Sequence, residues 1–357
     1  MPKKPKMVIC PRCHRTILRG ELAEHLRHHR GKLPMHLRSS ISPKTKIDRL
    51  ERPEQIHVPP IPSFEEFFKA HTASKPVKSN LSESQIRTKF EISLKDVGTT
   101  YTSLKLDATE KPEFIEVFID EKRNLTLKYS LLALRTITEQ AIDALLLHEA
   151  CHVSTLPDSL LRVPDIGGNA GVSFMANHLT NYDEYLAHVE FVNKFRQDPR
   201  FEALREQQVS LFGNFETMIE SMKLMVDATQ KAGRSLNQYY VLEQLGSIVY
   251  DSLFFFVAGD QSFLKWCKDH SLEGLGVFVS WIYEDFEHIR KLGLPRKESH
   301  DKVIVSGTLS MSVNPLKLLF FGQIEFAETT KGLHEDLMKQ GRDTDLVQLW
   351  EKRRRSY

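Results

Sequence analysis

The sequence has few cysteines, no long apolar run and no apolar segment behind its basic N-terminus. Only four of 357 residues are cysteine, and two of them, Cys151 and Cys267, are isolated. That number argues against a disulfide framework and favours a reducing compartment. The longest apolar run covers residues 253–258 and is far too short to cross a bilayer. We therefore expect no signal peptide and a cytoplasmic, nucleoid-associated or nucleus-associated protein.

Charge is unevenly divided along the chain. The formal net charge is +2, from 49 Lys and Arg against 47 Asp and Glu. Residues 1–50 hold 13 basic and 3 acidic side chains, a net charge of +10. The remaining 36 basic and 44 acidic side chains give the rest of the chain a net charge of −8. This asymmetry predicts a basic arm that meets a polyanion, attached to a mildly acidic body.

The basic arm contains a compact pattern of metal ligands. Cys10, Cys13, His25 and His29 follow the spacing C-x2-C-x11-H-x3-H, with His28 as an alternative to His29. This resembles a two-Cys, two-His zinc finger, one residue short of the usual central gap, and predicts a structural Zn²⁺. DNA or RNA is the expected partner, with a protein contact as the alternative. The residues expected to contact phosphates are Arg12, Arg15, Arg19, Arg27, Arg30 and Lys32.

Composition divides the chain into three regions: a finger at 7–32, a proline-rich basic linker at 33–80, and a folded body at 81–357. Alternating apolar residues predict strands at 114–120 and 125–130, joined by a turn. A helix should run from Thr136 or Thr138 to about residue 153, with Thr136 and Glu139 as a capping box. Further helices are expected at 181–196, 201–232, 236–257, 263–270 and 277–292, and a strand at 302–313. The predicted class is α+β, with a small sheet and a largely helical C-terminal half. The basic run 352–355 is expected to be a solvated tail.

One motif in the body carries hydrolytic chemistry. His148, Glu149 and His152 form H-E-x-x-H within the apolar helix predicted to end near residue 153. On a helix the two histidines share one face and can bind a single Zn²⁺, while Glu149 faces the water on that metal as a general base. The alternative is a surface helix on which these residues meet by accident. Cys151 is interpreted as a buried packing residue, with a redox switch as the alternative.

A catalytic zinc site needs a third protein ligand. The leading candidate is Glu184, in a second predicted helix that begins near Asn181, and its neighbour Ala187 would allow close packing. The competing ligands are His188, on the same helical face, and His178. Glu184 could instead form a capping box with Asn181. For the group that stabilises an oxyanion, the candidates are Tyr239, Tyr240 and His300.

His148-Glu149-x-x-His152 followed by Glu184-x-x-Ala187 resembles the gluzincin arrangement. It is particularly similar to the ImmA/IrrE metallopeptidases, in which a Glu of an E-x-x-A helix completes the site. The resemblance covers about residues 110–195. It implies a zincin-like fold, one catalytic Zn²⁺ and cleavage of a DNA-bound repressor or another protein. SprT-like repair proteases carry a third His soon after the motif, and this sequence has none between His152 and His178.

These features together predict a zinc metalloprotease that a basic finger tethers to nucleic acid. The rival hypotheses are a DNA-binding regulator with a catalytically inactive zincin-like scaffold, and a metal-dependent hydrolase of a substrate other than a peptide.

Overall fold

The computed structural model describes residues 7–9, 16–18, 78–109, 115–155, 170–231, 238–326, 337 and 344–356. The chain divides into two compact units, 1–58 and 59–357. In the first unit β1 (Met7–Ile9) pairs antiparallel with β2 (Thr16–Leu18). The predicted finger ligands Cys10, Cys13, His25 and His29 lie outside the described residues. The same holds for linker residues 33–77 and for the basic set Arg12, Arg15, Arg19, Arg27, Arg30 and Lys32.

In the part of the second unit that the structure describes, a three-stranded mixed sheet follows the first helix. Its strands are β3 (Ser103–Thr109), β4 (Ile115–Ile119) and β5 (Asn124–Ser130), in the order β3-β5-β4. β4 runs antiparallel to β5 and β3 runs parallel to it. The two predicted strands and the turn between them are confirmed, whereas β3 was not predicted. Leu125, Leu127 and Tyr129 alternate along β5 and are buried, as expected for a strand covered on one face.

Two helices next to the sheet pack against each other, α3 (Glu83–Val97) and α5 (Glu139–Thr155). A capping box of Ser82 and Gln85 begins α3. The short helix α4 (Leu131–Arg135) ends at Thr136. The capping box predicted for Thr136 is therefore wrong, and Thr138 instead accepts a 3.2 Å hydrogen bond from the backbone of the first turn of α5. The helix itself lies where the sequence predicted it.

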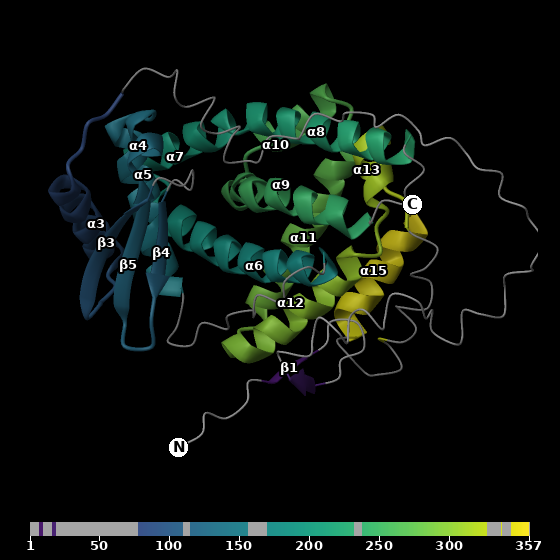
Figure 1. The fold of residues 1–357 in the computed structure, drawn as a ribbon, viewed down its shortest axis with the longest axis horizontal. Coiled ribbons are helices and arrows are strands. Elements are labelled where there is room, and N and C mark those ends of the chain that lie inside the picture. Colours follow the sequence, from purple (N-terminus) through teal and green to yellow (C-terminus); the bar gives the residue numbers. More distant parts are fainter. Residues whose placement is uncertain are drawn as a thin grey trace, which may run out of the picture. The chain divides into compact units, whose positions relative to one another are not determined.

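The rest of the unit is helical, which agrees with the predicted α+β class. The long helix α6 (Ala170–Phe195) packs against α5 and lies alongside α9 (Gln238–Ala258) (Figure 1). The helix predicted for 201–232 is divided at Leu211 into α7 (Pro199–Ser210) and α8 (Phe212–Lys231). The remaining helices are α10 (Ser262–Asp269), α11 (Glu273–Lys291), α12 (Arg296–Ser310), α13 (Pro315–Phe321) and α15 (Thr344–Ser356). In the part of the chain that the structure describes, no helix is both long and apolar enough to cross a membrane.

The strand predicted for 302–313 is wrong, because most of this segment belongs to α12. Its apolar residues alternate, but the buried row Val303, Ser306 and Ser310 has the spacing of a helix face. Gly307 lies in the same row, where α12 packs against α6. A Cβ atom at Gly307 would lie only 2.9 Å from His178 Cδ2 and from Met175 Sδ. Close contact between two helices thus decides the conformation of this segment.

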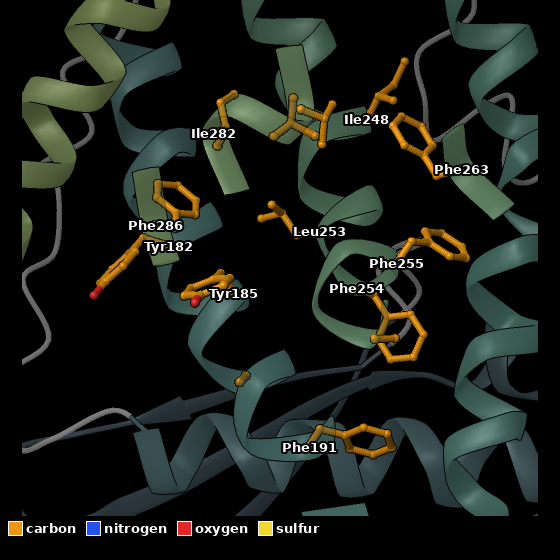
Figure 2. Close-up of a cluster of buried hydrophobic side chains, with 14 of the residues drawn as sticks. Tyr182, Tyr185, Phe191, Ile248, Leu253, Phe254, Phe255, Phe263, Ile282 and Phe286 are labelled. Atoms are coloured by element: carbon orange, nitrogen blue, oxygen red, sulfur yellow. The ribbon is translucent and has the colours of Figure 1, made fainter. Parts of the chain in front are cut away.

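Aromatic side chains fill the core between α6, α9 and α11. Figure 2 shows Tyr182, Tyr185 and Phe286 close together, with Phe254 and Phe255 contributed by α9. At the other end of this core, the rings of Phe191 on α6 and His148 on α5 lie 6.3 Å apart, measured between centroids. The apolar core therefore extends directly to the H-E-x-x-H helix and holds α6 against it.

The C-terminal helix α15 is anchored by a buried ion pair. Arg353 Nη1 donates to Asp285 Oδ1 on α11 at 2.8 Å, and both side chains are buried. Asp285 Oδ2 also accepts hydrogen bonds from Trp350 Nε1 at 2.8 Å and from Ser306 Oγ at 2.7 Å. The prediction that 352–355 is a solvated tail is therefore wrong for Arg353, although the side chain of Arg355 is 80% exposed.

Candidate metal centre

The H-E-x-x-H motif lies in the buried part of α5. Leu146, Leu147 and Ala150 are fully buried, and so is His148 apart from about a twentieth of its surface. The motif therefore does not lie on a surface helix. Cys151 is also fully buried, and burial raises the pKa of its thiol, which makes the thiolate scarce. This supports the packing role predicted for Cys151 over a redox role.

Glu184 brings α6 into contact with that motif. Its carboxylate lies among three imidazoles: Oε1 is 3.1 Å from His148 Nε2 and 3.1 Å from His188 Nε2, and Oε2 is 2.8 Å from His152 Nε2. Glu184 itself is 3% exposed. Asn181 lies within α6, eleven residues after its start, so the alternative interpretation of Asn181 and Glu184 as a capping box is wrong. Ala187 is fully buried, as expected where α6 packs closely on α5.

Several donor atoms in this cluster lack partners. His148 Nε2, Glu184 Oε2 and both ring nitrogens of His188 are buried without a hydrogen bond, although the groups face each other at about 3 Å. Unpaired buried polar atoms are costly, and a bound cation would satisfy His148 Nε2, Glu184 Oε2 and one ring nitrogen of His188 at once. Two overlapping triplets have ligand atoms within 4.8 Å of one another: His148, Glu184 and His188, and His148, Glu149 and His152. The residues present therefore fit a metal ion.

The charges in the cluster are strongly coupled. Burial acts to lower the pKa of His148, but the carboxylates of Glu184 and Glu149 outweigh it and raise that pKa to about 10. Burial also acts to lower the pKa of His152, and the carboxylates of Glu184 and Glu149 again raise it. Burial acts to raise the pKa of Glu184, yet the surrounding imidazoles hold it well below its usual value. The buried carboxylate thus requires positive charge beside it, which protons supply when no metal does.

This coupling predicts that metal binding releases protons. Because the pKa of His148 is raised to about 10, its ring is protonated at neutral pH in the metal-free protein. A ligating imidazole must be neutral, so the apparent zinc affinity of this centre should rise with pH between about 6 and 8.5, roughly tenfold per pH unit for each proton displaced. Calorimetry in buffers of different ionisation enthalpy would count the protons. The full-length Cys10→Ser, Cys13→Ser variant removes any zinc bound by the finger that the sequence predicts at residues 7–32. An affinity independent of pH would contradict this account.

Glu149 connects the cluster to the sheet. Its Oε2 accepts a 3.0 Å hydrogen bond from the backbone N–H of Val117, and its Oε1 lies 3.7 Å from His148 Nδ1. Val117 belongs to β4, one of the two edge strands of the sheet, and its N–H points toward Glu149 on α5. The carboxylate of the motif therefore lies between the proposed ligands and the outer edge of β4.

The group that the sequence analysis missed is Tyr250 on α9. Its side chain interacts with the Glu184 carboxylate, and burial together with the charges of Glu184 and Glu149 raises its pKa well above the usual value. Tyr239 and Tyr240 had been proposed from the same helix, but their side chains lie outside the described part of the chain. Tyr250 follows Tyr239 by eleven residues, which is about three helical turns. On a helix this spacing puts the two positions on the same face, and it is the one feature of the sequence that could have pointed to Tyr250.

The other histidines proposed from the sequence belong to neither metal-capable triplet among the described residues. His178, one of the competing third ligands, is buried on α6, and its Nε2 lies 3.2 Å from Ser306 Oγ in a hydrogen bond. Burial lowers its pKa to about 3, so it is neutral. His300 Nε2 lies 3.7 Å from Asp183 Oδ1, and His300 belongs to neither metal-capable triplet among the described residues.

Comparisons of this chain with protein-family models, with curated proteins and with solved structures give no match. Its chemistry is therefore inferred from the residues of the centre.

Proposed function

We propose that this chain is a zinc-dependent metalloprotease. The observation that carries the proposal is the meeting of His148, His152 and Glu184, with unpartnered donor atoms in a buried site and Glu149 beside them. Two imidazoles and one carboxylate form a ligand set typical of catalytic zinc, which keeps one position open for water or substrate. The regulator with an inactive scaffold is less well supported, because the described site has both these ligands and the general base.

Each residue of the centre has a role in this proposal. Bound zinc would lower the pKa of a water molecule and polarise the substrate carbonyl. Glu149 takes the proton of the attacking water and later delivers it to the leaving amine. Its Oε2 is held by Val117, so Oε1 is the oxygen available for the proton. The hydroxyl of Tyr250, which interacts with the Glu184 carboxylate, is the proposed donor that would stabilise the oxyanion. An extended peptide would pair with the outer edge of β4.

The N-terminal region gives the proposal its second part. The net charge of +10 in residues 1–50 and the four-ligand pattern at Cys10, Cys13, His25 and His29 favour a structural Zn²⁺ and non-specific contact with DNA or RNA phosphates. A single finger reads only about three base pairs, so it would localise the protease and leave sequence selection to other factors.

Glu184→Gln tests the metal centre. The amide cannot replace the charge that balances the metal, so zinc content should fall from two ions per chain to one, with the ion of the finger retained. Glu190→Gln is the matched control, since Glu190 lies on the same helix but pairs with Lys194 at 2.7 Å. Elemental analysis of the desalted full-length chain gives the stoichiometry. Two zinc ions and full activity in Glu184→Gln would refute the assignment of this ligand.

Truncation tests the tether. The body should be produced from Lys78 onward, because the Lys78 N–H donates to Arg135 O and the Ser79 hydroxyl to Leu134 O, each at 2.7 Å. This chain should lose most of its affinity for nucleic acid and most of the salt dependence of binding. Fluorescence anisotropy with labelled DNA and RNA at several salt concentrations measures both. Equal affinity of the truncated and full-length chains at the same salt concentration would show that the arm is not the tether.

A further inference from the structure

We infer that His188 is a fourth side-chain ligand of this centre, which would then hold its metal through three imidazoles and one carboxylate. The inference rests on the metal centre proposed above. It changes the expected coordination, because the sequence offered His188 only as a competitor of Glu184 for the third position. In the structure the two side chains converge on the same place.

The distances support an ion shared by His148, Glu184 and His188, whose ligand atoms all lie within 4.8 Å of one another. His188 follows Glu184 by one turn of α6, and its Nε2 lies as far from Glu184 Oε1 as His148 Nε2 does, 3.1 Å in each case. Two donors on one tetrahedral zinc are about 3.3 Å apart when each bond is about 2.0–2.1 Å. The rings of His148 and His188 are stacked, with centroids 4.8 Å apart and planes inclined by 30°. His152 reaches the second oxygen of the same carboxylate.

The surroundings of His188 give a second reason. The side chain is fully buried, Phe254 of α9 covers it at a centroid distance of 5.4 Å, and neither ring nitrogen has a hydrogen-bond partner. His178 on the same helix is equally buried, but its Nε2 is paired with Ser306. A histidine that only oriented Glu184 would donate a hydrogen bond to that carboxylate, and the 3.1 Å approach lacks hydrogen-bond geometry. Metal ligation through Nε2 accounts for the burial of His188 and for the missing partner of that nitrogen.

Four side chains change what the ion can do. They fill the four positions of a tetrahedral zinc site, which is the closed arrangement of structural sites. A reacting water then requires either a fifth coordination position or the departure of His188. The same set of three imidazoles and one carboxylate also suits divalent metals that take five or six ligands, so the preference of the centre for one metal becomes a measurable property.

The test is a count of imidazoles around zinc. The full-length Cys10→Ser, Cys13→Ser chain, in which the finger cannot bind zinc, would be loaded with one equivalent of zinc and studied by X-ray absorption at the zinc edge. We expect three imidazoles in this parent chain, two in its His188→Ala derivative, and three in the matched His178→Ala control. The zinc affinity of His188→Ala should fall by more than about 100-fold, beyond the 10–100-fold that the loss of an orienting partner causes.

Two imidazoles in the parent chain would overturn the inference, even if His188→Ala failed to fold. A count that His188→Ala or His188→Gln left unchanged would overturn it as well. Failure of the proposed function has a different signature. Three imidazoles without cleavage that depends on Glu149 would support His188 as a ligand and refute the protease. Two imidazoles with such cleavage would refute only the fourth ligand, and an absence of zinc from the centre would refute both.

Discussion

Replacing Glu149 with glutamine should abolish cleavage while the zinc content of the chain stays unchanged. Glutamine has almost the same shape, and its carbonyl oxygen can still accept the hydrogen bond that Val117 N–H donates to Glu149 Oε2 at 3.0 Å. The proposed ligands His148, His152 and Glu184 are untouched. The variant loses only the ability to take a proton from water, and the loss of a general base lowers a rate by about 10²–10⁴-fold.

Two reactions are measured: cleavage of the full-length chain by itself, and cleavage of an added unfolded protein. Each is followed after addition of zinc and again in the presence of a chelator. Glu190→Gln is the control, because it removes a carboxylate of the neighbouring helix α6 that belongs to neither metal-capable triplet. Glu190 Oε1 lies 3.4 Å from Ser154 Oγ, near the end of α5. Undiminished cleavage by Glu149→Gln would remove Glu149 from the mechanism. If the unaltered chain binds zinc but cleaves no peptide, the regulator and the hydrolase of another substrate become the better explanations.

The helix that carries His148, Glu149 and His152 was easier to predict from the sequence than the helix that carries Glu184. Residues 148–152 are a short pattern with fixed geometry, so an apolar helix around them is enough to place His148, Glu149 and His152. Glu184 depends on a second helix, whose predicted start at Asn181 was eleven residues too late because Asn181 and Glu184 imitate a capping box. Local signals cannot distinguish a true cap from the same residues inside a longer helix, where packing against α5 and α9 decides the outcome.

The same limit explains the other errors. Residues 302–313 alternate as a strand does, but their burial follows a helical row that fits against α6. Tyr250 carries no motif, and only the packing of α9 beside α6 brings its hydroxyl to Glu184. Arg353 lies in a run of basic residues that composition predicts to be solvated, and its partner Asp285 is 68 positions away. Contacts between distant segments leave no periodic signal in the sequence.

The buried pair of Arg353 and Asp285 leads to the largest expected change in stability. Arg353→Ala should lower the free energy of unfolding by about 3–5 kcal/mol, because it leaves a charged carboxylate in the core without its counter-ion. Burial already raises the pKa of Asp285 even with Arg353 beside it. Trp350 and Ser306 would still donate hydrogen bonds to Asp285, so part of the cost is offset.

Urea unfolding of the full-length chain, followed by circular dichroism, gives the difference in stability. Arg355→Ala is the matched control, because Arg355 is 80% exposed on the same helix and should change the free energy of unfolding by no more than about 0.5 kcal/mol. The double variant Asp285→Asn, Arg353→Met removes both charges and should recover part of the loss. Equal stabilities of Arg353→Ala and Arg355→Ala would mean that the pair does not hold α15 in place. Unchanged zinc content in Arg353→Ala would show that the metal centre does not depend on this anchor.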